Sequence, residues 1–419
     1  MKSEERKKFI SIMIWFCITM FYCYQYILRA LPNIIMPDIM DKYNVGATEF
    51  SSFAGMYYAG YVIVHIPIGI LLSRFGARAI LPMCIAITSI GLVPLAYFDN
   101  WTSVVIGRTL TGIGSSAAIV GALQIFRIIY PDKFSRMLGI MVFFGLITVV
   151  YAGSPLANVI AIIGIDATIG VLLYSGIALA VFTYLLMPKS AGETSHASIF
   201  TDIKATLGNP KIIVASLLAG FMVGPLEGFA DAWGSAFMIT VYDIEKSVAD
   251  TITLSVFLGM CIGCIVLPYI ADKTRMYFGV TISSGIVMIL CFVHILSGNA
   301  NADSLYYACL VTGVFCAYQV VIISKIATFV SEERSGVAAA IANMIIMAFG
   351  LLFHKFIGIT LDWQWDGTWK GQMIQGVRSY GTDAFINSIS IIPAATTIAV
   401  VGFIIMAMTN VIRVKLMKK

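Results

Sequence analysis

The stretch from Phe9 to Pro37, FISIMIWFCITMFYCYQYILRALPNIIMP, decides the fold of this chain. Its residues before Arg29 are uncharged, and about 20 such residues at about 1.5 Å each cross a hydrocarbon layer about 30 Å thick. Arg29 therefore lies toward the outer part of a membrane helix, where a charge still costs free energy. Its side chain either extends to the outer headgroups or meets a partner inside the protein. The positive-inside bias disfavours the first alternative.

The composition extends this conclusion to the whole chain. Hydrophobic residues make up 59% and charged residues 12%, against roughly 45–50% and 25% in soluble domains. We therefore expect a polytopic membrane protein rather than a soluble domain with an anchor. The net charge of +5 is spread over loops, which argues against a nucleic-acid partner. The apolar run after Lys8 is too long for a cleavable signal and predicts a retained first helix.

Twelve apolar segments follow one another, and all are expected to be helices, because open strands cannot satisfy their backbone groups in lipid. The expected spans are residues 9–31, 50–72, 79–97, 102–124, 138–160, 168–187, 211–239, 250–270, 277–297, 304–329, 336–360 and 384–408. They predict an all-α membrane protein with two six-helix halves. The N-terminal bundle is expected at 1–187, a cytoplasmic linker at 188–210, and a C-terminal bundle with a short basic tail at 211–419.

The basic residues predict the orientation in the membrane. Most of the 27 lysines and arginines fall in the two termini and in loops on the same side as the termini. The basic residues of the opposite loops are Lys42, Lys246, Lys370 and Arg378. By the positive-inside rule both termini are cytoplasmic, and we expect a multi-pass protein of the bacterial inner membrane.

Two loops indicate an internal repeat. Residues 69–78 read GILLSRFGAR, and residues 268–275 read PYIADKTR. Ser73 and Asp272 hold matching places in these loops, 199 positions apart. Two six-helix halves in parallel orientation, joined by a short linker, are one of the repeat arrangements of membrane transporters.

At these loops the chain resembles the major facilitator superfamily. The signature Gly-x-x-x-Asp-Arg-x-Gly-Arg-Arg is matched at Gly69, Arg74, Gly76 and Arg78. Two positions depart from it, since Ser73 replaces the aspartate and Ala77 replaces an arginine. A second superfamily motif, Arg-x-x-x-Gly-x-Gly, is matched at Arg108, Gly112 and Gly114.

The resemblance implies rocker-switch transport through a central cavity between the halves. The residues of the signature loop then form a cytoplasmic gate, a charge network that favours the outward-open state. Because Ser73 removes the acid from the first half, Asp272 in the second half is expected to carry more of this network.

Ionisable residues inside the apolar segments are the candidates for substrate and proton chemistry. Besides Arg29 they are Arg108, Glu227, Asp231 and Lys355. Glu227 and Asp231 share one helix face, and two carboxylates so close disfavour double ionisation. We therefore predict a proton-coupling pair, with a structural pair to an arginine as the alternative for Asp231. Glu227 is also the repeat equivalent of Arg29, 198 positions away, and we expect the two to face each other.

The first-helix pattern is similar to that of the organophosphate and organic-anion branches of the superfamily. That resemblance implies Arg29 as the ligand of a substrate anion, with Tyr22 and Tyr26 lining the site. Because the seventh helix offers Glu227 rather than a second arginine, an organic anion or a zwitterion fits better than a dianionic phosphate ester. Further substrate-site residues are predicted at Tyr58, Tyr61, Arg108 and Lys355. Plain packing is the alternative for the two tyrosines, and a helix-end position for the lysine.

These features predict a secondary active transporter that moves a small organic anion or zwitterion in symport with protons. Proton-antiport efflux of a drug, siderophore or metabolite is the alternative; the segment Gly153–Pro155 counts against it, because it lacks the further glycines of antiporters. A non-transporting receptor is disfavoured by the short loops. We expect a monomer with no enzyme activity, no cofactor and no metal, whose partners are substrate, protons and the lipid bilayer.

Overall fold

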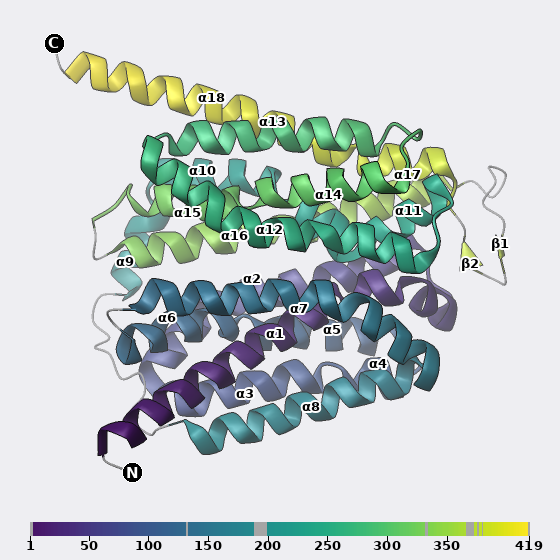
Figure 1. Ribbon diagram of the computed structural model, residues 1–419, viewed down its shortest axis with the longest axis horizontal. Coiled ribbons are helices and arrows are strands. Elements are labelled where there is room, and N and C mark those ends of the chain that lie inside the picture. The colour runs from purple at the N-terminus through teal and green to yellow at the C-terminus, as the bar shows by residue number, and fades with distance from the viewer. Residues whose placement is uncertain are drawn as a thin grey trace. The chain divides into compact units, whose positions relative to one another are not determined.

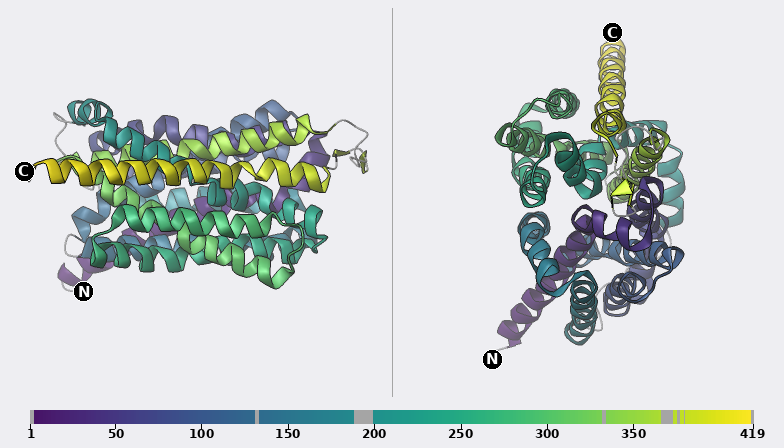
Figure 2. Two further views of the ribbon diagram at one scale, coloured as in Figure 1. Left: turned by 90° about the horizontal axis from the view of Figure 1, so that it is seen from above. Right: turned by 90° about the vertical axis from the view of Figure 1, so that its right-hand side faces the viewer.

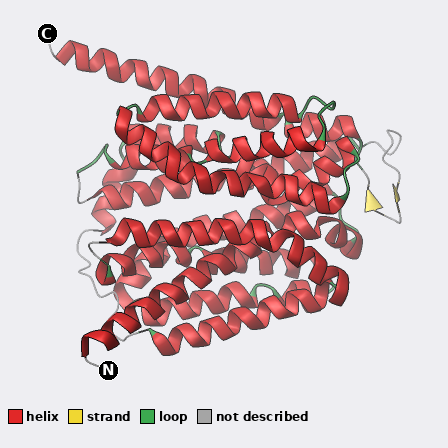
Figure 3. Ribbon diagram, in the orientation of Figure 1, coloured by secondary structure: helices red, strands yellow, loops and turns green. Residues whose placement is uncertain are grey.

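The computed structural model describes residues 3–130, 133–187, 199–331, 334–365, 373–374, 377–378 and 380–417. Nearly all of these residues are helical (Figure 3). The strands described are β1 (Met373–Ile374) and β2 (Val377–Arg378), which pair as an antiparallel hairpin. The chain separates into two compact units, and their boundary in the middle of the chain falls between Ile199 and Phe200.

The first unit comprises Met1–Val45 and Ser52–Ile199. Its helices are α1 (Ser3–Tyr43), most of α2 (Ala47–Phe75), α3 (Ala77–Ile90), α4 (Val93–Tyr97), α5 (Trp101–Ser115), α6 (Ala117–Ile129), α7 (Phe134–Ile163) and α8 (Ile165–Leu186). In this unit α1 packs against α7 and α8, and α3 packs against α5 and α8. Figure 1 shows these helices in purple to teal.

The second unit comprises Gly46–Ser51 and Phe200–Lys419. Its helices are α9 (Ile199–Leu207, which begins at the boundary), α10 (Pro210–Phe221), the π-helix η2 (Gly224–Trp233), α11 (Gly234–Tyr242), α12 (Lys246–Thr274), α13 (Tyr277–Ile295), α14 (Ala302–Cys316), α15 (Tyr318–Ala327), α16 (Ser335–Trp363), α17 (Thr382–Ile389) and α18 (Ile391–Met417). The long helices of each unit run lengthwise through it, and α18 extends past the end of α13 (Figures 1 and 2).

Eleven segments of the described chain are helical, long and apolar enough to cross a membrane, and α7 adds the shorter apolar stretch Met137–Val150. They match the twelve predicted spans one for one, so the predicted all-α membrane fold is confirmed. Several spans consist of two helices in series, such as α3 with α4 and α14 with α15. The span at 210–242 has three parts, α10, η2 and α11, and the sequence did not predict its π-helical middle.

The first helix is longer than predicted. It continues through Pro32 and Pro37 to Tyr43, whereas the prediction ended it at residue 31. Proline removes a backbone N–H donor and usually ends a helix in water. In a membrane protein, a neighbouring helix can satisfy the carbonyl that loses its donor, so the helix continues.

Close glycine contacts repeat in the two units. A Cβ on Gly112 of α5 would collide with the Tyr57 carbonyl of α2, and a Cβ on Gly313 of α14 would collide with the Val256 carbonyl of α12. The two glycines are 201 positions apart and the two carbonyls 199. In both units, therefore, the second and fourth spans are drawn together by glycine in the way typical of membrane helices.

The helix ends repeat as well. The Tyr43 hydroxyl donates to the Phe98 carbonyl at 2.9 Å, and the Tyr242 hydroxyl, 199 positions later, donates to the Ile295 carbonyl at 2.7 Å. Asn100 caps the start of α5 through the Ser103 N–H, and Asn301 caps the start of α14 in the same way. The internal repeat predicted from two loops thus extends to the packing and the caps of the helices.

The outer faces of the helices are apolar. On α8, Val171 (58% exposed), Tyr174 (66%) and Leu185 (68%) point away from the unit, while Thr168 and Thr183 of the same helix are buried. Apolar residues outside and polar residues inside suit a surface that faces lipid rather than water.

Candidate functional site

Arg29 of α1 lies in an aromatic cradle inside the first unit. Its side chain is buried, with 7% exposed. The guanidinium carbon lies 5.2 Å from the centre of the Tyr26 ring and 5.6 Å from that of Tyr58 on α2. Contacts of this kind between a cation and an aromatic face stabilise a charge away from water. The predicted lining residues Tyr26 and Tyr58 are thus in contact with the predicted anion ligand.

Tyr22 extends the cradle along α1. Its ring centre lies 5.0 Å from that of Tyr26. Gly145 of α7 makes room for it, because a Cβ there would come within 2.6 Å of the Tyr22 Cε1 and closer still to the Cδ1. The first-helix tyrosines are therefore placed by α7, a contact that a helical-spacing argument on α1 alone does not reveal.

Arg108 binds the backbone of α1, and its predicted role as a substrate ligand stays a prediction. Its Nη1 donates to the Leu28 carbonyl at 2.5 Å, and its Nη2 donates to the Arg29 carbonyl at 3.0 Å. Pro32 explains the first of these bonds, because it has no N–H to donate to the carbonyl four residues earlier. Arg108 therefore replaces the missing helical donor, and it braces α1 at the residue that carries the candidate ligand.

Aromatic rings also follow one side of α2. Tyr57 stacks on Tyr61 at 6.3 Å and Tyr61 stacks on His65 at 5.1 Å between ring centres. The Tyr57 hydroxyl donates to the Gln25 side-chain carbonyl of α1 at 2.7 Å. These contacts tie α2 to the cradle. The predicted place of Tyr61 in the substrate site stays a prediction.

In the second unit, Glu227 and Asp231 lie in η2. Every residue of this π-helix is buried, and the two acids are 0% and 2% exposed. Gly224 and Gly228 pack on Phe353 of α16, at 2.8 and 3.1 Å from where their Cβ atoms would be. The η2 glycines therefore let this helix approach α16 closely. π-helical turns inside longer helices are frequent at functional sites, but the proton role of the two acids stays a prediction.

The exposed position of Lys355 does not support its predicted role in substrate binding. It is exposed on α16, on the same face as Leu352 (56% exposed) and Ile359 (54%). The opposite face of α16 carries the buried Phe353 and His354. Residues three or four apart share a helix face, so Lys355 belongs to the apolar outer face and its long chain can extend toward headgroups.

The predicted cytoplasmic gate residues are placed at helix ends. Gly76 has a φ of 76°, a conformation that favours glycine, where α2 ends and α3 begins. Arg78 lies over the Tyr184 ring at 5.1 Å, whereas Arg74 is exposed beside Phe75. A Cβ on Gly69 would lie 3.6 Å from the Val120 Cγ1 of α6, an ordinary van der Waals contact.

The acid of the second-half loop is also described. Asp272 is exposed and accepts a hydrogen bond from the Tyr277 hydroxyl at 2.6 Å. Ser73 lies in α2, but its side chain is outside the described part of the chain. A charge network among the gate residues therefore stays a prediction.

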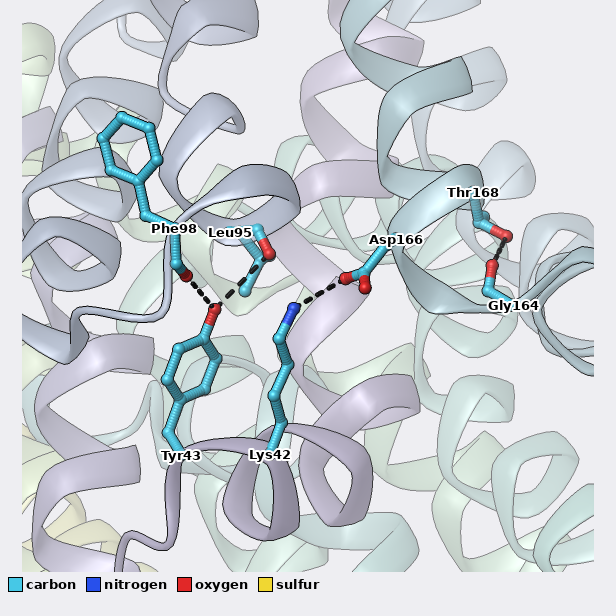
Figure 4. Close-up of polar contacts among 7 residues, drawn as sticks. All are labelled: Lys42, Tyr43, Leu95, Phe98, Gly164, Asp166 and Thr168. Atoms are coloured by element: carbon cyan, nitrogen blue, oxygen red, sulfur yellow. Dashed lines mark hydrogen bonds and ion pairs between the residues drawn. The ribbon is translucent and has the colours of Figure 1, made fainter.

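An ion pair at the opposite end of the first unit joins α1 to α8. The Lys42 Nζ lies 2.7 Å from the Asp166 Oδ1. Figure 4 shows this pair beside Tyr43, which bonds the carbonyls of Phe98 and Leu95. The pair is partly exposed, and such pairs contribute about 0–1 kcal/mol.

Two acids escaped the sequence analysis. Asp250 is 1% exposed near the start of α12, where it accepts a hydrogen bond from the Ser235 hydroxyl. Its other oxygen has no hydrogen-bond partner among the described residues. Asp362, near the end of α16, binds the start of α2. Both stand at the edge of an apolar run, where hydropathy does not distinguish a buried acid from a loop residue.

These features define a polytopic membrane protein with two helical units that bury Arg29 and Arg108 in the first and Glu227 and Asp231 in the second. Residues 14–353 match the model of the Major Facilitator Superfamily. The chain belongs to this superfamily, and it is a membrane transporter rather than an enzyme.

Solved structures share the fold over nearly the whole chain. A bacterial homolog of the human lysosomal transporter Spinster, inward-facing and unoccupied, superposes with a TM-score of 0.77 at 16% identity, covering 94% of this chain and 96% of that one. The nucleoside transporter NupG gives 0.74 at 13% identity over 95% and 98%. A D-xylose-proton symporter gives 0.69 at 15% identity over 94% and 97%. At these identities the likeness concerns the fold.

Sequence relatives match over a shorter stretch. The uncharacterized transporter YybO of Bacillus subtilis is 26% identical over 105 residues, which are 25% of this chain and 24% of YybO. An uncharacterized transporter of Buchnera aphidicola is 28% identical over 111 residues, 25% of this chain and 28% of that protein. The chain thus matches about a quarter of the length of these relatives.

Proposed function

We propose that this transporter carries a small organic anion or zwitterion in symport with protons. The observation that carries the proposal is the cradle of Arg29, a buried guanidinium placed against two aromatic rings and braced by Arg108 through the backbone. A guanidinium presents its donors in a rigid fork that matches a carboxylate. A residue with this chemistry inside a membrane span is by default a candidate for substrate binding.

The acids of the second unit supply the opposite charge. Glu227 and Asp231 are buried in η2, and a buried carboxylate is costly unless it is paired or protonated. Either state serves the proposal, because a proton or the ammonium group of a zwitterion can neutralise the charge. This arrangement favours a substrate with one carboxylate over a phosphate ester with two negative charges.

Proton symport follows from linkage between the two charges. If binding of the anion at Arg29 favours protonation of Glu227, then protonation of Glu227 must strengthen binding of the anion by the same factor. The substrate anion and the proton would then bind together and cross the membrane in the same direction. The D-xylose-proton symporter, which shares the fold, is itself named for transport of this kind.

The predicted orientation completes the proposal. With both termini in the cytoplasm of a bacterial inner membrane, the loop at Gly69–Arg78 faces the cytoplasm and the pair Lys42–Asp166 faces the outer side. The transporter acts as a monomer in this proposal, with the bilayer, the substrate and protons as its partners.

A ligand screen tests the substrate class. The melting temperature of the purified protein is measured with carboxylates, amino acids, short peptides, sugar phosphates and siderophores at several concentrations. A ligand at about 100 times its Kd stabilises the folded state by about 2.7 kcal/mol. We expect stabilisation by a carboxylate or an amino acid that Arg29→Ala abolishes and that Lys204→Ala, a control at an exposed position of α9, retains. Stabilisation by sugar phosphates alone, or full retention in Arg29→Ala, would overturn the proposal.

A further inference from the structure

The first turn of α2 is held by the second unit. Residues Gly46–Ser51 belong to that unit, while the helix from Ser52 onward belongs to the first. In the described part of the chain, α2 is therefore a helix whose start and remainder belong to different units.

Side chains from two places in the second unit bind this turn. The first N–H groups of a helix have no partner within the helix. The Ala47 N–H donates to the Tyr380 hydroxyl oxygen at 2.6 Å, and the Thr48 N–H donates to the Asp362 Oδ2 at 2.7 Å. The Tyr380 hydroxyl in turn donates to the Asp362 Oδ1 at 2.5 Å. The Asp362 carboxylate thus binds the Thr48 N–H directly and the Ala47 N–H through the Tyr380 hydroxyl.

The packing around these bonds is close. Gly358 lies one turn before Asp362 on α16, and a Cβ there would collide with the Ser51 Cβ and come within 2.5 Å of the Ala47 carbonyl. Ser51 is fully buried. Phe50 packs edge-on against Trp233 at 5.4 Å between ring centres. The first turn of α2 therefore packs against α16 and η2, and the absence of a side chain at Gly358 makes room for it.

We propose that Asp362 and Tyr380 form a latch that holds the first turn of α2 and that opens and closes in each transport cycle. The bonds suit this role because they are directional and centred on one carboxylate at a helix N-terminus, where negative charge is favoured. With the orientation proposed above, the latch lies at the outer face. It rests on the alternating-access transport of the proposed function, but not on the substrate class.

Cysteine labelling tests the latch without any substrate. Ser51→Cys is introduced as a reporter, and its rate of reaction with a maleimide is measured on purified protein after subtracting the labelling of the parent chain. We expect Asp362→Asn to raise the rate of maleimide labelling about tenfold. Tyr380→Phe should raise it several-fold. The controls Asp383→Asn and Tyr307→Phe change exposed residues outside the latch and should leave it unchanged. Unchanged labelling in both latch variants would overturn the proposal.

A second measurement separates a moving latch from a static helix cap. Thr48→Cys with Asp362→Cys replaces the bond between these residues by a reducible disulfide. Exchange of the ligand found in the screen should stop after oxidation and return after reduction, while each single cysteine variant continues to exchange. Continued exchange by the oxidised protein would show that transport does not require the first turn of α2 to separate from residue 362, and it would overturn the proposal. Failure of the substrate proposal would instead appear in the Arg29→Ala screen and leave the labelling result unchanged.

Discussion

Arg108 holds the backbone of Arg29, because its Nη2 donates to the Arg29 carbonyl at 3.0 Å. The same guanidinium bonds the Leu28 carbonyl, which loses its helical donor to Pro32. The arginine of the Arg-x-x-x-Gly-x-Gly motif therefore acts through the main chain on Arg29, the proposed substrate ligand. Pro32 of α1 leaves the Leu28 carbonyl without its helical donor, and Arg108 of α5 supplies a donor in its place. The carbonyl in turn gives the buried guanidinium an acceptor inside the membrane.

This pairing predicts a coupling between Arg108 and Pro32. Arg108→Gln removes the donor that replaces the Pro32 N–H at the Leu28 carbonyl, and a buried group left unsatisfied costs about 1–3 kcal/mol. In the background of Pro32→Ala, the restored backbone N–H serves the Leu28 carbonyl, so the same change should cost about 1 kcal/mol less. The free energies of unfolding of the four proteins in detergent form a double-mutant cycle that measures this difference.

The control for this cycle is Arg78→Gln, which removes an arginine at the start of α3. Arg78→Gln should lower the free energy of unfolding by the same amount with and without Pro32→Ala, because no contact between Arg78 and the Pro32 region is seen among the described residues. Strict additivity between Arg108→Gln and Pro32→Ala would mean that the proline does not explain the arginine.

Arg29→Lys should weaken binding of the substrate anion at least about tenfold, or about 1.4 kcal/mol. Lysine keeps the charge but cannot give two parallel N–H donors to a carboxylate. Binding is measured by titration of the ligand found in the screen, and the melting temperature without ligand should stay close to that of the parent. Equal affinities of Arg29→Ala and the parent protein would exclude Arg29 as the ligand.

The sequence predicted the twelve spans and the repeat because long apolar runs and loop motifs are local signals. The resemblance of the first helix implied that Tyr26 lines the site of Arg29, and the two residues lie three positions apart on one helix. The brace by Arg108, the Asp362 latch and the outward direction of Lys355 depend on which helices are neighbours, which no single span encodes. The π-helix at η2 escaped because a wider helical turn leaves almost no trace in hydropathy.

Ser73→Asp should shift the conformational balance toward the outward-open state. The substitution restores the acid of the superfamily signature at the end of α2, where a carboxylate can pair with basic residues of neighbouring helix ends. Accessibility of single cysteines at the two ends of the transporter reports the shift. Ser73→Asn has the same shape without the charge and should behave like the parent. Equal labelling of Ser73→Asp and Ser73→Asn at both ends would contradict the prediction.

The coupling role of Glu227 gives the last prediction. Glu227 is fully buried in η2, next to Asp231 on the same side of the helix. Glu227→Gln resembles the permanently protonated acid, since it keeps the shape and loses the charge. The variant should still bind substrate, but binding should no longer depend on pH, because the proton that was linked to the anion is gone.

Transport should divide into two parts in this variant. Exchange of labelled for unlabelled substrate needs no net proton movement and should survive, whereas accumulation driven by an imposed proton gradient should be lost. Both are measured in proteoliposomes, with Glu245→Gln at an exposed position outside η2 as the control. If Glu227→Gln still accumulates substrate, the proton binds elsewhere. Asp231→Asn and Asp250→Asn are then the next variants to compare, because these acids are the other buried carboxylates of the second unit's early spans.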